Sequence, residues 1–567
     1  MYARSLLALI LFSFSATSSA LEVTACASDT QAGAGTNLKQ AIAAGGVVTF
    51  RCAAGTRLLV ADSHSLPADT VIDGGGAVTL VVRLDIAPAF VVGANQRLTI
   101  TRLRLEGDRR VPGGRTPGIT TVLVGNGGTA VWRGVLAQKL DRPMFVMQSG
   151  RAILEETSFS DGPDPVRTTG DAQLEVRGGR FERMPGAIYA DGGRVTIAGT
   201  RFTGSRLVLN HCELQIADAT FSDNDVRGAG LSGGALDTDC KGLVTRTLFQ
   251  NNRAVHGGAV NLRSLYEDIE FQRVRFIANQ VTGDGGAIHR EAYLALIRNP
   301  SVPMKIRYSV FRTNSAANGG AIFIGTGPVE MYASHFAENA ATGNGGAIFA
   351  TALRASRVTL IRNRAGQAGG AIHAYIASHP YHGLVTSTIA NALIVQNEAP
   401  RGAGIYGGAL RLVNSTVADN TGPGVDAGDS TVTPAITLTN SLFVTNTGGQ
   451  CQGTAATAFA ISGPNLQNPG TSCPGVAVAD PYLDPVYAPV AGSPALGAGD
   501  MKTCLDMPVN GRDALGEPRP QGRNGCTIGA IENAVERQIW NRLIRRTDEN
   551  PADLISQIRD LARHLMH

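Results

Sequence analysis

The chain contains GGAIFIG at 319–325, GGAIFAT at 345–351 and GGAIHAY at 369–375. Related strings are GGALDTD (233–239), GGAVNLR (257–263), GGAIHRE (285–291) and the variant GAGIYGG (402–408). Each is a short apolar run bounded by Gly, Asn or Asp and shows no helical period, a pattern typical of strand, turn and strand. Their recurrence indicates a structural repeat of roughly 25 residues.

An Asn stands five or six residues before most of these strings, usually as Phe-x-x-Asn. Examples are Phe221/Asn224, Phe249/Asn252, Phe276/Asn279, Phe311/Asn314, Phe336/Asn339 and Phe443/Asn446. A unit this short cannot bury a core alone, so neighbouring units must stack. We therefore expect an all-β chain wound into a single parallel β-helix solenoid. Each Phe should point inward onto the Phe of the next coil. Each Asn should lie at a turn, where it tolerates left-handed geometry, and should join an Asn side-chain ladder.

Other readings of the repeat fit less well. A leucine-rich repeat requires a Leu spacing that is absent here, and a globular β-sandwich has no need of a fixed Gly-Gly-Ala string. An open coil exposes strand edges, so caps are expected at both ends. Residues 36–44 (TNLKQAIAA) predict an N-terminal cap helix, and residues 533–567 predict a C-terminal helical segment. This last segment either packs on the coil or binds a partner.

The first 20 residues predict a secretory signal peptide, with Arg4, an apolar run over 5–14 and small residues at 18–20. The run is too short to span a membrane, so the mature protein should begin near Leu21 and be exported. Although 69 residues are Gly, no three-residue period supports collagen, and 43% hydrophobic residues exclude wholesale disorder. A net charge of +4 over 567 residues does not indicate a nucleic-acid partner. We expect a monomer without a transmembrane segment in the mature chain.

The eight cysteines agree with export, because disulfides form in oxidising compartments. They are Cys26, Cys52, Cys212, Cys240, Cys451, Cys473, Cys504 and Cys526. Eight cysteines permit 105 connectivities, so the sequence alone leaves the pairing open. We expect sequential neighbours to pair, because each pair is separated by about one coil and would join adjacent coils.

The GGAI and FxxN strings resemble those of the polymorphic outer-membrane protein repeats. The segments AGSPALGAGD (491–500), GRDALGEPRP (511–520) and CTIGAIE (526–532) resemble the closing motif of exported bacterial β-helix proteins with a choice-of-anchor domain. The resemblance covers roughly residues 22–532. It implies the right-handed parallel β-helix of the pectate-lyase-like superfamily and a protein that is periplasmic, secreted or on the surface of a Gram-negative bacterium. That fold hosts lyases, hydrolases, epimerases and non-catalytic adhesins, so it implies no single activity.

Strand alternation places side chains within each string. If the first glycine is position 1, positions 4 and 6 should point inward and positions 5 and 7 outward. The expected outward residues are Asp237 and Asp239, Asn261 and Arg263, His289 and Glu291, Phe323 and Gly325, Phe349 and Thr351, and His373 and Tyr375. Tyr189 and Asp191 fit the same two columns. An alternative alignment of 228–237 with 402–411 would move Asp237 out of its column.

Successive coils lie about 4.8 Å apart, so these columns should form one surface. Its candidate catalytic residues are Asp237, Asp239, Arg263, His289 and Glu291. Carboxylates could hold Ca²⁺ against a sugar acid, Arg could bind its carboxylate, and His or Glu could exchange protons near neutral pH. The candidate ligand-binding residues are Asn261, Phe323, Phe349, His373 and Tyr375, whose rings suit sugar stacking. The alternative is that the charges are merely paired surface groups.

Two functions follow from this surface. The first is an exported, non-catalytic, adhesin-like protein that binds extracellular polysaccharide or a cell-surface glycan. The second is a polysaccharide lyase or hydrolase that acts on an acidic glycan through the face from Asp237 to Glu291. No P-loop or HExxH string occurs, and the usual polygalacturonase motifs are not recognisable.

Overall fold

The computed structural model describes residues 20–33, 35–83, 88–108, 120–163, 166–264, 267–290, 302–374, 378–379, 383–384, 386–428, 434–453, 458–520 and 525–532. The chain divides into two compact units, residues 1–164 and 165–567. In the described residues, the regular structure of each unit is mainly short parallel strands whose ladder partners lie about one coil away in sequence. The predicted fold class, a mostly β parallel solenoid, is therefore confirmed.

Three ladders of parallel strands form the first unit. The first ladder joins β1 (Leu21–Val23), β2 (Gly46–Phe50), β5 (Thr70–Asp73), β8 (Arg97–Thr101), β11 (Thr129–Arg133) and β14 (Arg151–Glu155). The second joins β3 (Arg57–Val60), β6 (Thr79–Arg83), β9 (Arg104–Asp108), β12 (Leu136–Gln138) and β15 (Ser158–Ser160). The third joins β4 (His64–Ser65), β7 (Phe90–Val92), β10 (Thr120–Val124) and β13 (Arg142–Met147).

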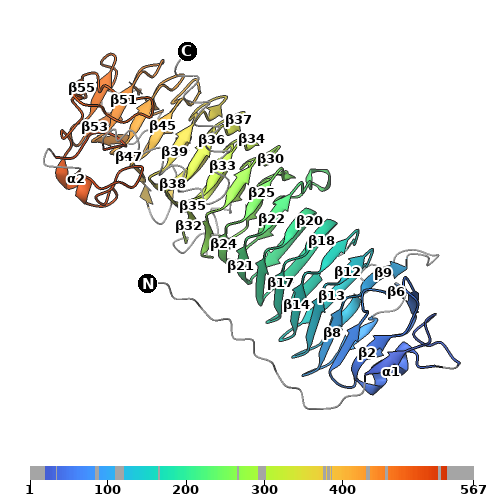
Figure 1. Cartoon of the computed structure of the whole chain (residues 1–567). Helices are drawn as coiled ribbons and strands as arrows, with labels where there is room; N and C mark the ends of the chain where they lie inside the picture. Colours follow the sequence, from blue (N-terminus) through green and yellow to red (C-terminus); the bar gives the residue numbers. More distant parts are fainter. Residues whose placement is uncertain are drawn as a thin grey trace, which may run out of the picture. The chain divides into compact units, whose positions relative to one another are not determined.

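The second unit repeats this plan in three longer ladders (Figure 1). Four long strands each take part in two of them: β18 (Arg180–Asp191), β20 (Arg201–Asn210), β35 (Ile322–Tyr332) and β38 (Ile348–Ser356). The Phe ladder contains the first parts of β18 and β20, then β22 (Thr220–Ser222), β25 (Leu248–Gln250), β29 (Arg275–Ile277), β33 (Val310–Arg312), β36 (His335–Ala337), β39 (Thr359–Ile361), β45 (Leu393–Val395), β48 (Thr416–Ala418), β51 (Leu442–Val444), β54 (Leu466–Asn468) and β55 (Ala477–Val478).

The glycine-string ladder carries the candidate site. It contains β16 (Val166–Thr169), the second parts of β18 and β20, β23 (Leu236–Thr238), β27 (Val260–Leu262), β31 (Ile288–Arg290), the first parts of β35 and β38, β41 (Ile372–Ala374), β46 (Ile405–Gly407), β49 (Val425–Asp426) and β52 (Cys451–Gln452).

The remaining strands complete the coils. The third ladder contains β17 (Gln173–Arg177), β19 (Arg194–Ala198), β21 (Glu213–Ala217), β24 (Lys241–Thr245), β28 (Ile269–Gln272), β32 (Met304–Arg307), the second parts of β35 and β38, β44 (Ser387–Ala390), β47 (Leu410–Val413), β50 (Ile436–Thr439) and β53 (Phe459–Ile461). A narrow corner sheet contains β26 (Arg253–Ala254), β30 (Gln280–Val281), β34 (Ser315–Ala316), β37 (Ala340–Ala341) and β40 (Arg364–Ala365), and β42 (Ser378–His379) and β43 (Gly383–Leu384) form an antiparallel pair.

The interior of the second unit holds the predicted Phe stack and Asn ladder. Successive rings from Phe181 to Phe336 lie 4.6–5.0 Å apart and are nearly parallel. From Asn252 to Asn446, each Asn side-chain amide donates to the side-chain oxygen of the next Asn at 2.8–3.0 Å. Both predictions are confirmed, because a residue's place in the coil repeats from one turn to the next.

The turn before the Asn ladder differs from the prediction. The left-handed residue is the one preceding each ladder Asn: φ is +53° at Ala278 and +58° at Glu338, which precede Asn279 and Asn339. The Asn itself is fully buried and uses its side chain for hydrogen bonds. Asn is therefore selected here for its two donors and its acceptor, rather than for left-handed backbone geometry.

The glycine pair has two structural roles at the corner of the coil. Gly285 has a φ of +70°, and a Cβ on Gly286 would lie 2.0 Å from the carbonyl oxygen of Gly320 in the next coil. A side chain at either position would therefore strain the backbone or collide with it. This requirement explains why the Gly-Gly pair recurs at each of these corners.

Position 6 of each string points inward, as predicted, even where the residue is charged. Arg290 is 1% exposed, and its guanidinium donates to the carbonyls of Ser264, Val302 and Pro328 at 2.9–3.3 Å. Burial lowers the pKa of Arg290 to about 10. This cation thus binds three backbone acceptors at a corner of the coil, which satisfies its donors inside the solenoid.

The first unit begins with the predicted cap helix, α1 (Leu38–Ala44). Asn37 and Gln40 form a capping box at its start, which satisfies two free N–H groups. Close to the helix, the buried Asp29 carboxylate accepts from the N–H groups of Ala61 and Asp62 at 3.0 Å and lies 2.7 Å from His64 Nε2.

We expect the stability of this N-terminal cap to fall at acid pH, because the Asp29 carboxylate contributes to it. Burial raises its pKa, but the hydrogen bonds from His64, Ala61 and Asp62 outweigh burial and lower it overall. The resulting stabilisation is present above the unfolded-state pKa of about 3.9 and is lost as pH falls through the lower folded value. Asp29→Asn should cost about 1–3 kcal/mol at pH 7 and little near pH 2. Urea unfolding at both pH values tests this, with Asp62→Asn as control, because the half-exposed Asp62 carboxylate pairs with Lys39 at the surface. Equal losses at both pH values would contradict it.

The C-terminal segment, described over residues 479–520 and 525–532, lies along the outside of the Phe ladder. It contains one short helix, α2 (Met501–Leu505). Its residues Tyr487, Ala495 and Ile528 pack against a cluster of outward side chains: Val395, Ala418, Leu442 and Val444. The closing motif at 491–532, expected as part of the solenoid, thus follows the last ladder strand, β55, and covers a side of the coil.

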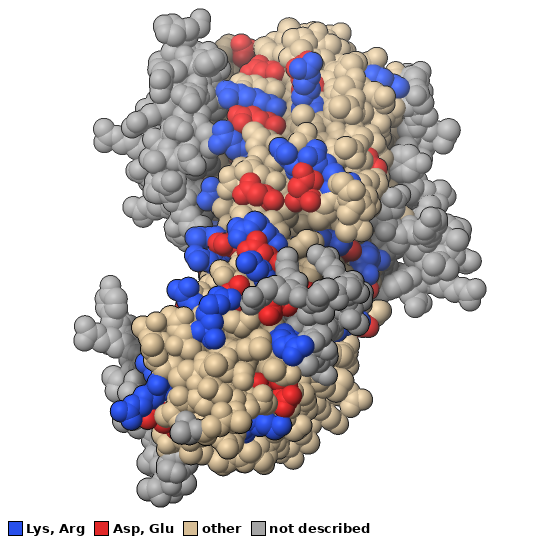
Figure 2. Space-filling view, turned by 90° about the vertical axis from the view of Figure 1, so that its right-hand side faces the viewer, with Lys and Arg blue, Asp and Glu red and all other residues tan. Residues whose placement is uncertain are grey.

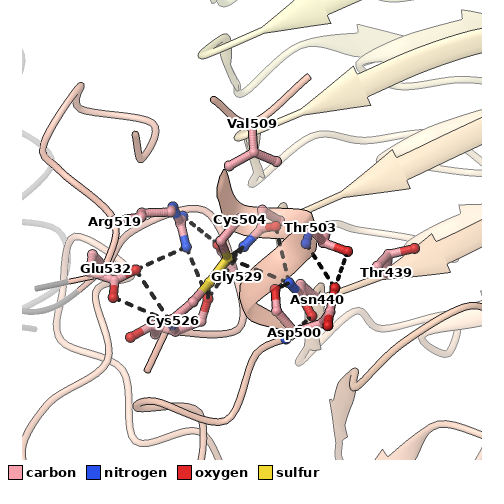
Figure 3. The surroundings of a disulfide bond; sticks show 12 residues. Thr439, Asn440, Asp500, Thr503, Cys504, Val509, Arg519, Cys526, Gly529 and Glu532 are labelled. Carbon is pink, nitrogen blue, oxygen red and sulfur yellow. Dashed lines mark hydrogen bonds and ion pairs between the residues drawn. A yellow bond between two sulfur atoms is a disulfide. The ribbon is translucent and has the colours of Figure 1, made fainter. Parts of the chain in front are cut away.

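A buried polar network fixes this segment to the turns beneath it (Figure 3). Asn440 accepts from the N–H of Asp500 at 2.8 Å, donates to the Asp500 carbonyl at 3.1 Å, and its own carbonyl accepts from Gly529 at 2.8 Å. Arg519 lies 3.2 Å from Glu532, and both side chains are at most 2% exposed.

Four disulfides join Cys26 to Cys52, Cys212 to Cys240, Cys451 to Cys473 and Cys504 to Cys526. Sequential neighbours pair, as predicted, and the four bonds support an extracytoplasmic protein. In the part of the chain that the structure describes, no helix is long and apolar enough to cross a membrane. The predicted signal peptide, apart from Ala20, and the predicted helices at 533–567 lie outside the described residues.

Candidate functional site

Backbone pairing confirms the register of the glycine strings. Asp237 pairs with Asn261, Asn261 with His289, and His289 with Phe323. The same column continues through Phe349, His373, Tyr406 and Asp426. Leu236 pairs with Val260, so the alternative alignment that would displace Asp237 does not occur. Glu291 and Tyr375, two of the candidate residues, lie outside the described residues.

Asp237 is surrounded by partners. Its carboxylate oxygens lie 2.8 Å from Arg206 Nη2, 2.9 Å from Asn261 Nδ2 and 3.1 Å from Arg263 Nε. Its side chain is 15% exposed. Burial lowers the pKa of Arg206, which also donates to the carbonyls of Ser232 and Gly233. Asp237 therefore anchors two guanidinium groups and is poorly placed to act as a free base.

Asp239 lies one position beyond the strand and holds the neighbouring imidazole. Its Oδ1 accepts from the backbone N–H of His211 at 2.6 Å, and its Oδ2 lies 3.9 Å from His211 Nε2. His211 Nδ1 is 3.4 Å from Asp191 Oδ1, and the imidazole is 79% exposed. An exposed imidazole between two carboxylates can donate hydrogen bonds and carry a proton.

Arg263 completes this polar surface. Its Nη2 donates to the carbonyl of Leu209 and to the side chain of Asn210, while Asp237 holds its Nε. Asn210 in turn donates to Tyr189 OH at 3.1 Å. We call these exposed or half-exposed residues the polar face: Tyr189, Asp191, Asn210, His211, Asp239 and Arg263. Arg263 remains 36% exposed, so a ligand can reach a guanidinium whose orientation is already fixed.

Further along the same column, five rings form an outer aromatic ladder: His289, Phe323, Phe349, His373 and Tyr406. Their centroids are 4.8–5.4 Å apart. Each ring that is not at an end of the ladder has a neighbouring ring on both of its faces. The side chains of His289, Phe323 and His373 are only 8–9% exposed. Sugar stacking on open ring faces was expected here, whereas the ladder presents ring edges.

The two histidines of this ladder are held differently. His289 Nδ1 lies 2.9 Å from Asn261 Oδ1, which links the ladder to the polar face, and the His256 ring lies 4.8 Å from the His289 ring. Burial lowers the pKa of His373 to about 4. His373 is therefore neutral at physiological pH, and its ring forms part of the stack.

Four residues at this surface were not identified from the sequence. Three of them, Arg206, Asn210 and His211, lie outside the glycine strings, so no repeat signal marked them. Tyr406 had a signal, because GAGIYGG at 402–408 aligns it with His373. The Arg401 guanidinium lies 4.8 Å above the Tyr406 ring and pairs with Asp426 at 3.3 Å, and so closes this end of the ladder.

Paired charges also occur away from the site. Figure 2 shows Lys and Arg interspersed with Asp and Glu on one face of the molecule. Arg246 pairs with Asp218 at 2.7 Å in the turns between strands, and Arg194 with Glu213 at 2.8 Å on an exposed sheet surface. Such pairs contribute little to stability. Among the described residues, no group of three or more His, Cys, Asp or Glu side chains is placed to hold a metal ion, so the Ca²⁺ hypothesis gains no site here.

Comparisons with known proteins support the repeat and leave the activity open. The Chlamydia polymorphic membrane protein repeat matches residues 334–351. The A-module of a mannuronan C-5 epimerase from Azotobacter vinelandii is similar at 12% identity, over 77% of this chain and 91% of that one, with a TM-score of 0.20. No curated protein matches the chain. The chain is a β-solenoid in which residues 334–351 match the polymorphic membrane protein repeat.

Proposed function

We propose that this chain is an exported solenoid protein that binds an extracellular polysaccharide or a cell-surface glycan through its polar face. The proposal rests on the position of the Arg263 guanidinium. Asp237 fixes its orientation on one side, and its other side is open to solvent. Tyr189, Asn210 and His211 lie beside it and offer further donors and acceptors. An acidic sugar could place its carboxylate on Arg263 and its hydroxyls on these groups.

Binding without turnover is favoured because the carboxylates are already occupied. Asp237 accepts from two arginines and an amide, and Asp239 accepts from the His211 backbone. A general base must be within reach of a substrate proton. Carboxylates that already accept hydrogen bonds from protein groups, as Asp237 and Asp239 do, are less available to act as general bases.

Arg263→Ala is expected to weaken binding of an acidic polysaccharide at least tenfold, about 1.4 kcal/mol, because the fixed guanidinium is lost. Affinity electrophoresis of the mature chain in gels containing alginate, polygalacturonate or a neutral glucan measures the change. Arg194→Ala is a matched control, since Arg194 is an exposed arginine paired with Glu213 on another ladder. Equal retardation of both variants in every gel would refute a role for the polar face.

A second candidate function is a polysaccharide lyase or hydrolase that acts on an acidic glycan through the face from Asp237 to Glu291. His211 favours it, because its exposed imidazole lies beside two carboxylates, an arrangement of groups that general acid–base catalysis uses. Release of unsaturated ends, followed at 235 nm, or of reducing ends would show turnover. Loss of that turnover in His211→Ala would establish this second function, and binding without turnover would leave the first.

A further inference from the structure

Asn261 connects the outer aromatic ladder to the polar face. Its side-chain oxygen lies 2.9 Å from His289 Nδ1, and its Nδ2 donates to Asp237 Oδ1 at 2.9 Å. The same Asp237 oxygen lies 3.1 Å from Arg263 Nε. A continuous series of polar contacts therefore joins the end ring of the ladder to the guanidinium that the proposed function uses.

The chemistry of the three groups fixes the direction of each hydrogen bond. An Asn side chain has an acceptor oxygen and a donor nitrogen, and an ionised carboxylate can only accept. Because Asn261 turns its nitrogen to Asp237, its oxygen faces His289, whose Nδ1 must carry a proton and donate. A ring without an N–H at this place would leave the Asn261 oxygen without this donor, and the amide would lose the contact that sets its orientation.

The aromatic ladder holds His289 in place. His289 is 8% exposed, and its ring lies 5.4 Å from the Phe323 ring, to which it is nearly parallel. The ring of His256, from the preceding coil, lies 4.8 Å away. A buried ring packed against two others has little freedom to turn, so its N–H lies at a defined point.

The orientation of Arg263 depends in turn on Asp237. Asp237 Oδ1 has two partners, the Asn261 amide and Arg263 Nε, while Arg206 binds Oδ2 at 2.8 Å. Without the Asn261 donor, the carboxylate could turn about its bond to Arg206. The guanidinium of Arg263 would then move with it.

We propose that His289 and Asn261 are positioning residues of the polar face. The ladder fixes His289, His289 orients Asn261, and Asn261 holds the carboxylate that keeps Arg263 ready for a ligand. This role rests on the proposed function. It assigns His289, a candidate catalytic residue, to support of the site rather than to contact with the ligand.

His289→Phe tests this role, because it removes the N–H and keeps a flat ring in a column that continues with Phe323 and Phe349. His373→Phe is the matched control: it makes the same change in the same ladder, where the ring lies against Phe349. Two quantities are measured on the full chain. One is the dissociation constant for alginate, by calorimetry, and the other is the rate at which phenylglyoxal modifies Arg263, by mass spectrometry.

His289→Phe should speed the modification of Arg263 about threefold or more and weaken alginate binding by a similar factor, whereas His373→Phe should change neither. Asn261→Ala should have the same two effects. Adding His289→Phe to it should change nothing further, because both substitutions break one connection. Arg290, the neighbour of His289, is 1% exposed and should stay unmodified in every variant if strand β31 remains folded.

Three results would overturn the positioning role. They are equal modification rates in His289→Phe and His373→Phe, effects of His289→Phe and Asn261→Ala that multiply in the double variant, and modification of Arg290 together with Arg263. The measurements also separate this role from the proposed function. If His289→Phe speeds modification but Arg263→Ala leaves alginate binding unchanged, the proposed function fails and the positioning role stands. If Arg263→Ala weakens binding while His289→Phe behaves as the control, the positioning role fails and the proposed function stands.

Discussion

Replacing Asn339 by alanine is expected to lower the free energy of unfolding by about 3–5 kcal/mol. The Asn339 side chain is 0% exposed and takes part in four hydrogen bonds. Its amide donates to the Phe311 carbonyl and to Asn363, and its oxygen accepts from the backbone and the side chain of Asn314, all at 2.9–3.0 Å. Alanine would leave these partners buried and unpaired, and each such group costs about 1–3 kcal/mol.

Equilibrium unfolding in urea measures this loss. Thr342→Ala is the control, because it shortens an exposed side chain of the same coil without touching the ladder. We expect the control to lie within about 0.5 kcal/mol of the unchanged protein. A loss below about 1 kcal/mol in Asn339→Ala would show that the Asn ladder is not a main source of stability.

Replacing Arg519 by methionine is expected to cost about 3–5 kcal/mol in the stability of residues 479–532, because it breaks a buried ion pair. Arg519 lies 3.2 Å from Glu532 and donates to the carbonyls of Thr527, Gly529 and Ala530 at 2.6–2.9 Å. Methionine would leave the Glu532 carboxylate buried without its partner. Figure 3 shows Arg519 and Glu532 beside the disulfide of Cys504 and Cys526.

Because this segment covers one side of the coil, its loss should be local. Hydrogen exchange of the 526–532 amides should become faster by two to three orders of magnitude or more, while the amides of β25 and β29 change little. Arg512→Met is the control, since Arg512 is exposed and contacts only the Gly516 carbonyl within this segment. Equal exchange in the two variants would contradict a structural role for the buried pair.

The three outer faces of the second unit therefore differ in use. The glycine-string ladder carries the polar face and the outer aromatic ladder, and the Phe ladder carries the C-terminal segment. The third ladder presents paired charges such as Arg194 and Glu213. One repeat can support these different surfaces because only the inward positions are needed to maintain the stack.

The sequence repeat is sufficient to determine the fold. Phe and Asn recur at equivalent places in each coil, and a residue that repeats inside a stack must meet its own copies. The same logic predicted the neighbour pairing of the cysteines and the column from Asp237 to His373. Arg290 also points inward, as the register predicts, although a charged residue is unusual at an inward position.

The residues of the candidate site could not all be predicted, because contacts between side chains of different coils are not encoded in the repeat. His211 and Arg206 lie outside the glycine strings, and only the stacked coils bring them to Asp239 and Asp237. Spacing placed the aromatic residues in one column, but only the side-chain packing showed that neighbouring rings cover one another's faces. The sequence by itself thus determined which residues share a coil position, because backbone periodicity is local. Tertiary structure alone decided which side chains are occupied and which can reach a ligand, because hydrogen bonds and burial depend on neighbours from several coils.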